Sequence, residues 1–163
     1  QDIDICSLLE NITLGLSPSI EAKKLKLVTS CSPQKLIIRS DSLRLQQIIT
    51  NLLINAIRYT ATGTIELTCC ILPKNYLEIK VSDTGIGISA EDKEAIFERF
   101  FRVENRVHTL EGTGLGLSIV RNIIEKHNSR VYIDSKVGVG TSFWFELPIY
   151  NPSQKNPELT IKS

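Results

Sequence analysis

The sequence of 163 residues has almost no excess charge of either sign. Nineteen lysine and arginine residues stand against eighteen aspartate and glutamate residues, which leaves a formal net charge of +1. Nucleic acids and anionic membrane surfaces attract proteins that carry a clear positive excess, so neither is an expected partner. Any phosphate group that this chain binds must be held by a local arrangement of side chains.

A long apolar run is also missing. No stretch approaches the roughly twenty apolar residues that are needed to span a bilayer, and the first residues do not show a basic region followed by an apolar run. We therefore expect a soluble fragment that makes no membrane contact, in the cytoplasm or the plastid stroma. A longer parent protein could still be membrane-bound.

Cysteine and histidine are scarce and do not form metal-binding patterns. The four cysteines, Cys6, Cys31, Cys69 and Cys70, show neither a zinc-type spacing nor a C-x-x-C pair. We expect all four to be reduced and structural. The hydrophobic fraction of 42% is enough for one domain to bury a core without disulfides or metals.

The apolar residues change their period several times along the chain, and each change predicts an element. Helical spacing is expected from Ile5 until Pro18, for the amphipathic helix over 41–59 with Asp41 as its cap, for a short helix over 90–96, and for a helix containing 119–124. Strands are expected at 36–38, in a hairpin over 65–71 and 77–81, from Val131, and over 143–147. The polar segment 102–113 is predicted to be a loop.

This order of elements indicates an α/β fold. We predict a two-layer α/β sandwich, in which a mixed, mostly antiparallel sheet is covered on one face by about three helices. Residues 1–150 are expected to form the domain. Residues 151–163 are polar and contain proline, and are expected to be a flexible C-terminal tail.

Asp83 is a candidate functional residue. It shares the parity of the inward residues of its strand, so its carboxylate is expected to point toward the buried face, where an unpaired charge costs several kcal/mol. Thr141 has the same inward parity at the start of the last strand. A carboxylate and a hydroxyl at the floor of an apolar pocket could recognise an amino-purine, with the carboxylate accepting a hydrogen bond from the exocyclic amine. The alternative is that Asp83 only caps the turn into Gly85.

Two glycine-rich segments are further candidates for contact with a ligand. Residues 83–88 read Asp-Thr-Gly-Ile-Gly-Ile, and residues 112–117 read Gly-Thr-Gly-Leu-Gly-Leu and lead into a helix. Glycine lets the backbone approach a ligand closely, and free N–H groups at a helix start bind phosphate. Glycine pairs also occur in ordinary turns, and a third pair, Gly138 and Gly140, could be a plain hairpin turn that brings Thr141 into place.

The helix over 41–59 carries the candidate metal ligands. Asn51 and Asn55 lie one turn apart on one face, and Arg58 and Tyr59 follow a turn later. The amide oxygens could hold a magnesium ion that also relies on phosphate oxygens and water. A solvated polar face is the alternative interpretation of these residues.

Together these segments resemble the catalytic domain of sensor histidine kinases, over roughly Ile5 to Pro148. The match consists of ordered motifs: 51–60 (Asn-Leu-Leu-Ile-Asn-Ala-Ile-Arg-Tyr-Thr) resembles the family's asparagine box, and the segments 83–88, 96–103, 112–118 and 138–141 follow in the family's order. The sequence of residues 106–111 resembles the corresponding segment of cyanobacterial or plastid sensor kinases. The resemblance implies the Bergerat ATP-binding fold.

The resemblance also implies a set of site residues for ATP and magnesium. Asn55 would bind the metal, and Asn51, Arg58 and Tyr59 would approach the phosphates, although the family often has lysine in place of Arg58. Arg58 and Arg102 would stabilise phosphate charge during catalysis. The base pocket would consist of Asp83, Gly85, Gly87, Ile88 and Thr141, and the lid over the phosphates of Gly112, Thr113, Gly114, Leu115, Gly116 and Leu117.

The reaction implied by the resemblance is transfer of the ATP γ-phosphoryl group to a histidine. The family's acceptor histidine lies on a preceding dimerising hairpin, and neither His108 nor His127 has the surrounding sequence of that acceptor. We therefore expect the chain to bind ATP, to be monomeric, and not to phosphorylate itself efficiently. The implied partners are the dimerisation and phosphotransfer segment of the parent kinase and a response regulator.

Three other functions are compatible with parts of the sequence. A hydrolytic ATPase of the same fold typically has a glutamate one turn before the magnesium asparagine, where this chain has Asn51. A dinucleotide-binding oxidoreductase is disfavoured because Asp83 would repel a pyrophosphate beside the loop. A noncatalytic nucleotide-sensing or docking module could keep every pocket residue.

Overall fold

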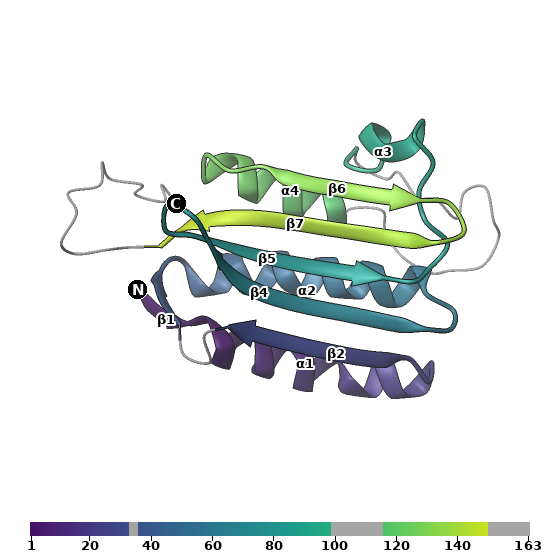
Figure 1. Cartoon of the computed structure of the whole chain (residues 1–163), viewed down its shortest axis with the longest axis horizontal. Helices are drawn as coiled ribbons and strands as arrows, with labels where there is room; N and C mark the ends of the chain where they lie inside the picture. Colours follow the sequence, from purple (N-terminus) through teal and green to yellow (C-terminus); the bar gives the residue numbers. More distant parts are fainter. Residues whose placement is uncertain (33–35, 99–115, 150–163) are drawn as a thin grey trace.

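A five-stranded mixed sheet forms one layer of the computed structural model, which describes residues 1–32, 36–98 and 116–149 (Figure 1). Its strand order is β2-β4-β5-β7-β6. The β2–β4 pair is parallel, and the other three pairs are antiparallel. The strands are β2 (Lys26–Ser32), β4 (Thr64–Leu72), β5 (Tyr76–Asp83), β6 (Val131–Lys136) and β7 (Gly140–Pro148).

Helices form the second layer, on one face of this sheet (Figure 1). They are α1 (Ile5–Ala22), α2 (Ser42–Tyr59) and α4 (Gly116–Lys126), and the short α3 (Asp92–Ala95) lies at one end of the sheet. Two short strands, β1 (Asp2–Asp4) and β3 (Ile37–Arg39), pair with each other near the chain start. The predicted two-layer sandwich, with a mostly antiparallel sheet covered on one face by three helices, is confirmed.

The central helix α2 forms where its amphipathic pattern predicts it. Its buried residues recur every three or four positions and face the sheet: Leu45, Ile48, Ile49, Leu52, Leu53, Ala56 and Ile57. Asp41 caps its start, because the carboxylate accepts hydrogen bonds from the backbone N–H groups of Leu43 (3.0 Å) and Arg44 (3.2 Å). This cap determines where α2 begins.

The strands bury every second side chain against this helix layer. The inward residues of the central strands are Ile65, Leu67 and Cys69 on β4, Leu77, Ile79 and Val81 on β5, and Thr141, Phe143, Phe145 and Leu147 on β7. On the opposite face, the Tyr132 and Trp144 rings stack with their centroids 5.6 Å apart. The alternation fixes the register, since a slip of one residue would exchange the two faces.

The start of the chain differs from the prediction. Helix α1 does not end at Pro18 but continues to Ala22, because Ile20 extends the buried stripe of Leu9 and Ile12. Strand β2 was not predicted either. It is an edge strand whose residues are all at least partly exposed, so its sequence has no clear alternation.

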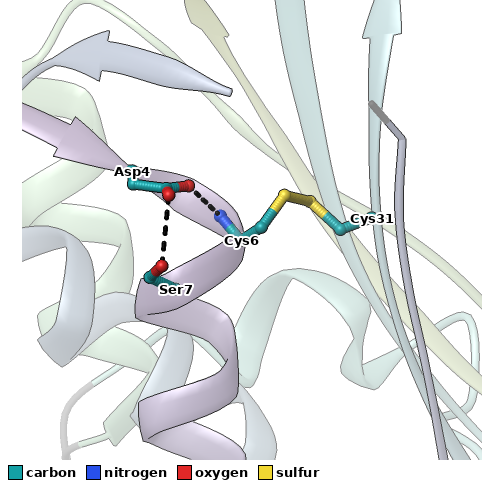
Figure 2. The surroundings of a disulfide bond; sticks show 4 residues. All are labelled: Asp4, Cys6, Ser7 and Cys31. Carbon is teal, nitrogen blue, oxygen red and sulfur yellow. Dashed lines mark hydrogen bonds between the residues drawn. A yellow bond between two sulfur atoms is a disulfide. The ribbon is translucent and has the colours of Figure 1, made fainter. Parts of the chain in front are cut away.

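The prediction that all four cysteines are reduced is wrong for two of them. Cys6 and Cys31 form a disulfide that joins the first turn of α1 to β2, with Cα atoms 6.0 Å apart (Figure 2). Asp4 caps the same turn by accepting from the Cys6 N–H (3.2 Å) and the Ser7 hydroxyl (3.1 Å). The pairing depends on β2, which places Cys31 over the helix start. Cys69 and Cys70 are free thiols, as expected.

Two expectations lie outside the described residues, namely the loop at 102–113 and the tail at 151–163. Within the described part of the chain, no helix has the length and apolar character that crossing a bilayer would require.

Candidate functional site

Residues from four strands form one row at the end of the sheet where β5 ends. Asp83 pairs with Ile65 of β4 on one side and with Thr141 of β7 on the other, and Thr141 pairs in turn with Ser135 of β6. The parity argument that placed Asp83 and Thr141 on the inner face therefore brought together two residues 58 positions apart, because their strands are neighbours in exact antiparallel register.

The Asp83 carboxylate is half-buried at the end of β5. Burial raises its pKa, and hydrogen bonds from the backbone N–H groups of Gly85 and Thr141 act in the opposite direction. The Gly85 N–H lies 2.8 Å from Oδ1. This contact is the turn cap that the sequence left open as an alternative. A carboxylate has about four acceptor positions, so the cap still leaves capacity for an amine donor.

Thr141 lies next to Asp83 and is 6% exposed. Its hydroxyl is 2.8 Å from the Ser135 hydroxyl, which also receives the Ile88 N–H at 2.7 Å. The sequence interpretation did not include Ser135. Strand alternation could have identified it, since Ser135 shares the inward parity of Val131 and Ile133 along β6. Ile88 itself is buried beside this group, at 7% exposure.

The glycines of this region let the backbone pack on itself. A Cβ at Gly85 would lie 2.3 Å from the Tyr59 carbonyl oxygen, and one at Gly87 would lie 2.2 Å from the Lys136 carbonyl oxygen. At Gly140 the collision would be with the Asp83 carbonyl oxygen, at 2.0 Å. Gly87 and Gly140 also have positive φ. The segment 83–88 is consequently clamped between the end of α2 and the β6–β7 turn.

The polar edge of α2 ends beside this segment. The Ile86 N–H donates to the Tyr59 carbonyl at 3.2 Å, so the carboxyl end of α2 touches the loop that follows Asp83. Asn51, Asn55, Arg58 and Tyr59 are all half-buried on this helix. The carboxyl end of α2 and the loop that follows the strand-end acid are thus in direct contact.

Lys23 holds the end of α2 from the other side. Its ammonium group donates to the Ile57 carbonyl (2.5 Å) and the Arg58 carbonyl (3.4 Å), and burial lowers the pKa of Lys23. These carbonyls belong to the last turn of the helix, where a cation is favoured. No local pattern predicts this contact, because it joins residues 34 and 35 positions apart.

The donor set suits a hard cation only together with a ligand that brings its own oxygens. Among the described residues, no group of three histidine, cysteine, aspartate or glutamate side chains could hold a metal ion. Amide oxygens such as those of Asn51 and Asn55 fit magnesium, which usually takes one or two protein ligands plus phosphate oxygens and water. The residues present therefore fit a magnesium–nucleotide pair better than a bare metal.

The remaining predicted site residues are only partly described. Arg102, Gly112, Thr113, Gly114 and Leu115 lie outside the described residues. Gly116 and Leu117 open α4, which packs against α2. The His127 Nδ1 lies 2.5 Å from the Ile123 carbonyl oxygen, one helical turn earlier. His108 lies outside the described residues.

Comparison with known proteins identifies a family and relatives that are similar in sequence. The model of one family, described as histidine kinase-, DNA gyrase B-, and HSP90-like ATPase, matches residues 40–151. The chain is 44% identical over 158 residues to drug sensory protein A of Synechocystis sp., covering 91% of this chain and 24% of the relative. It thus spans about a quarter of the length of this curated relative.

Two solved structures are similar in fold and sequence. Full-length ShkA, in complex with AMPPNP, has a TM-score of 0.82 and 30% identity, covering 91% of this chain and 31% of that chain. The histidine kinase ThkA, in complex with the response regulator protein TrrA, has a TM-score of 0.77 and 26% identity, covering 94% of this chain and 43% of that chain.

Proposed function

Because the chain belongs to the histidine kinase-, DNA gyrase B-, and HSP90-like ATPase family, we propose that it is the ATP-binding catalytic domain of a two-component sensor histidine kinase. The observation that carries the proposal is the strand-end pair of Asp83 and Thr141, set against the asparagine-bearing end of α2. This arrangement offers acceptors for a purine amine on one side and ligands for a phosphate-bound cation on the other.

The base would lie beside the row at the end of the sheet. Asp83 would accept from the exocyclic amine of adenine, and Ile88 would provide an apolar contact. Gly85 and Gly87 shape the loop, because their tight packing fixes the backbone that borders the pocket. Thr141 would complete the polar floor. Burial around Asp83 strengthens the interaction with an amine donor, since water competes less well there.

The phosphates would lie along α2. Asn55 would hold magnesium, which when bound neutralises phosphate charge, and Asn51, Arg58 and Tyr59 would contact the phosphate oxygens. Arg102 and the segment 112–117 are proposed to reach the terminal phosphates and to form the lid. Phosphoryl transfer requires mainly positioning and charge stabilisation, so no covalent step is assigned to this chain.

The phosphoryl acceptor would be a histidine on a dimerisation segment, and a response regulator would receive the group next. The structure of ThkA with TrrA supports the second partner, since it shows such a pairing for a protein of similar fold. We further propose that residues 1–150 act as a monomeric unit in the cytoplasm or plastid stroma, without contact to nucleic acid or membrane, and that 151–163 is a tail.

A nucleotide titration tests the proposal. Isothermal titration of the chain with ATP, with and without magnesium, should show binding that is strengthened by the metal. Asp83→Asn should weaken ATP binding by about tenfold or more, because a hydrogen bond to a charged group is lost. The matched control is Asp134→Asn, which changes an exposed acid on the outer face of β6. Unchanged affinity in Asp83→Asn would remove that residue from the base pocket.

The second candidate is a noncatalytic nucleotide-sensing or docking module, which would bind ATP in the same way. It differs in that no phosphoryl group would reach a histidine when a dimerisation segment is added. A hydrolytic ATPase is a weaker candidate, because Asn51 occupies the position where an acid would activate water. Steady release of phosphate by the chain alone would favour that reading.

A further inference from the structure

The Ser135 hydroxyl is the centre of a small hydrogen-bond network beside the candidate base pocket. It lies 2.7 Å from the Ile88 backbone nitrogen, 3.0 Å from the Gly140 carbonyl oxygen and 2.8 Å from the Thr141 hydroxyl. These partners come from the loop after β5 and from the first two residues of β7. Ser135 itself is half-buried.

Counting protons fixes the direction of each bond. A serine hydroxyl has one hydrogen to donate and two lone pairs to accept with. The Ile88 N–H can only donate and the Gly140 carbonyl can only accept, so the serine hydrogen goes to Gly140. The contact to Thr141 must then run from the threonine to the serine, because Ser135 has no second hydrogen.

This direction determines what Thr141 can offer a ligand. Once its hydrogen is given to Ser135, the Thr141 hydroxyl presents only lone pairs to the pocket. Asp83, its cross-strand partner, is also an acceptor when ionised. Asp83 and Thr141 would therefore offer the proposed base pocket two acceptors side by side and no side-chain donor from this pair.

We propose that Ser135 is a positioning residue that sets base specificity, by holding Thr141 as an acceptor so that the pocket selects a purine with an exocyclic amine. The proposal rests on the proposed function, since it assumes that a purine nucleotide occupies this site. An amine at the 6-position supplies two hydrogens, whereas a 6-oxo group supplies an acceptor that faces two other acceptors. Buried polar groups left unpaired in this way make such discrimination strong.

ATP and inosine triphosphate test this directly, because they differ only in that amine and the adjoining ring proton. Calorimetric titration of the wild-type chain should show much tighter binding of ATP. In Ser135→Ala the Thr141 hydrogen is released and can donate to the 6-oxo group. The ratio of ATP to inosine triphosphate affinities should then fall about threefold to tenfold, the size of one neutral hydrogen bond.

Controls separate this role from a structural one. Ser135→Thr keeps the hydroxyl and should restore the wild-type ratio. Ser142→Ala removes a hydroxyl from a similar cross-strand pair between β5 and β7, with Ser82 at 2.8 Å, on the opposite face of the sheet, and should leave the ratio unchanged. Should Ser135→Ala not fold, Ser135→Cys replaces the hydroxyl with a weakly hydrogen-bonding group of similar shape and should lower the ratio as well.

Equal losses of affinity for both nucleotides in Ser135→Ala, with an unchanged ratio, would overturn the proposal and leave Ser135 with a purely structural role. Failure of the proposed function looks different. In that case the wild-type chain itself binds neither nucleotide, or binds both without preference.

Discussion

At Asp83, the proposed binding of the base and the stability of the fold favour different protonation states of the carboxyl group. Its burial raises the pKa of the carboxyl group, so the folded state favours the protonated form more than the unfolded chain does. The contribution of this group to stability is thus fully present below the unfolded pKa and is lost as the pH rises through the folded pKa. At neutral pH the charged form is retained at a cost to stability.

Asp83→Asn should show this cost in a pH series of urea unfolding. The variant is expected to be as stable as the wild type or more stable at pH 7, while it loses nucleotide affinity. Its advantage should shrink as the pH falls through the folded pKa of Asp83 toward the ordinary aspartate value, because the wild-type group then becomes neutral as well. A variant that loses stability equally at every pH would show that the Gly85 cap outweighs desolvation.

Thr60 gives a second test with single residues. It follows α2, is 0% exposed, and its hydroxyl oxygen has no hydrogen-bond partner within the described chain. An unsatisfied buried polar group costs about 1–3 kcal/mol. Thr60→Val should therefore raise the free energy of unfolding by about 1 kcal/mol, measured by chemical denaturation. Thr13→Val is the matched control, since the Thr13 hydroxyl is exposed and donates to the Glu10 carbonyl at 2.9 Å, and no gain is expected there.

How far single residues could be predicted depends on the range of the interaction. Strand parity is a local property, and it was sufficient to put Asp83 and Thr141 on the inner face. The contacts of Lys23 with the end of α2 and of Ser135 with Ile88 join distant segments. Nothing in the spacing of those residues specifies such contacts, because they depend on how the elements pack.

Among the elements, α1 and β2 are joined by the one covalent crosslink of the described chain (Figure 2). A disulfide that closes a loop of this length stabilises a protein by about 3 kcal/mol in the chain-entropy model. The double variant Cys6→Ser/Cys31→Ser should lose stability by that order of magnitude, and reduction of the wild type by dithiothreitol should have the same effect on its melting temperature.

Cys70→Ser is the control for this crosslink. It removes a free, half-buried thiol on β4 and should leave the dependence on reductant intact. A wild-type chain whose melting temperature is insensitive to dithiothreitol would contradict the structural pairing. Cys69 is unsuitable as a control because it is buried in the core, where desolvation raises the pKa of its thiol to about 12.

The difference between local patterns and long-range packing also explains which helices and strands could be predicted from the sequence. Strong periodicity marks α2, α4, the β4–β5 hairpin and β7, because each has one fully buried face. Strand β2 lies at the sheet edge and its residues are mostly exposed, so alternation is weak. Helix α1 continues through Pro18 because burial of Ile20 compensates for the lost backbone hydrogen bond.

At the scale of the whole molecule, the order of helices and strands was enough to predict the layers, whereas the strand order and the one parallel pair were not encoded in any local pattern. The proposed activity also belongs to this scale. The chain alone should incorporate almost no label from γ-labelled ATP. Adding a dimerisation segment with its histidine should produce labelled segment, with acid-labile and base-stable phosphate.

That experiment has an informative control. Asn55→Ala, at the proposed metal ligand, should lower the transfer to the added segment by about tenfold or more, as expected for loss of a group that positions the metal. Leu43→Ala changes an exposed residue at the far end of the same helix and should leave the transfer unchanged. Efficient labelling of the chain in the absence of any added segment would contradict the assignment of the acceptor to a separate element.

The position of β7 affects how the molecule is made. This strand is the last in the described chain, yet it lies between β5 and β6, and β6 joins the sheet only through it. The ribosome must therefore synthesise the chain through residue 148 before all five strands can pair. Until then, Asp83 has a neighbouring strand only on its β4 side, so the row that links Ile65, Asp83, Thr141 and Ser135 cannot be complete before the last strand is made.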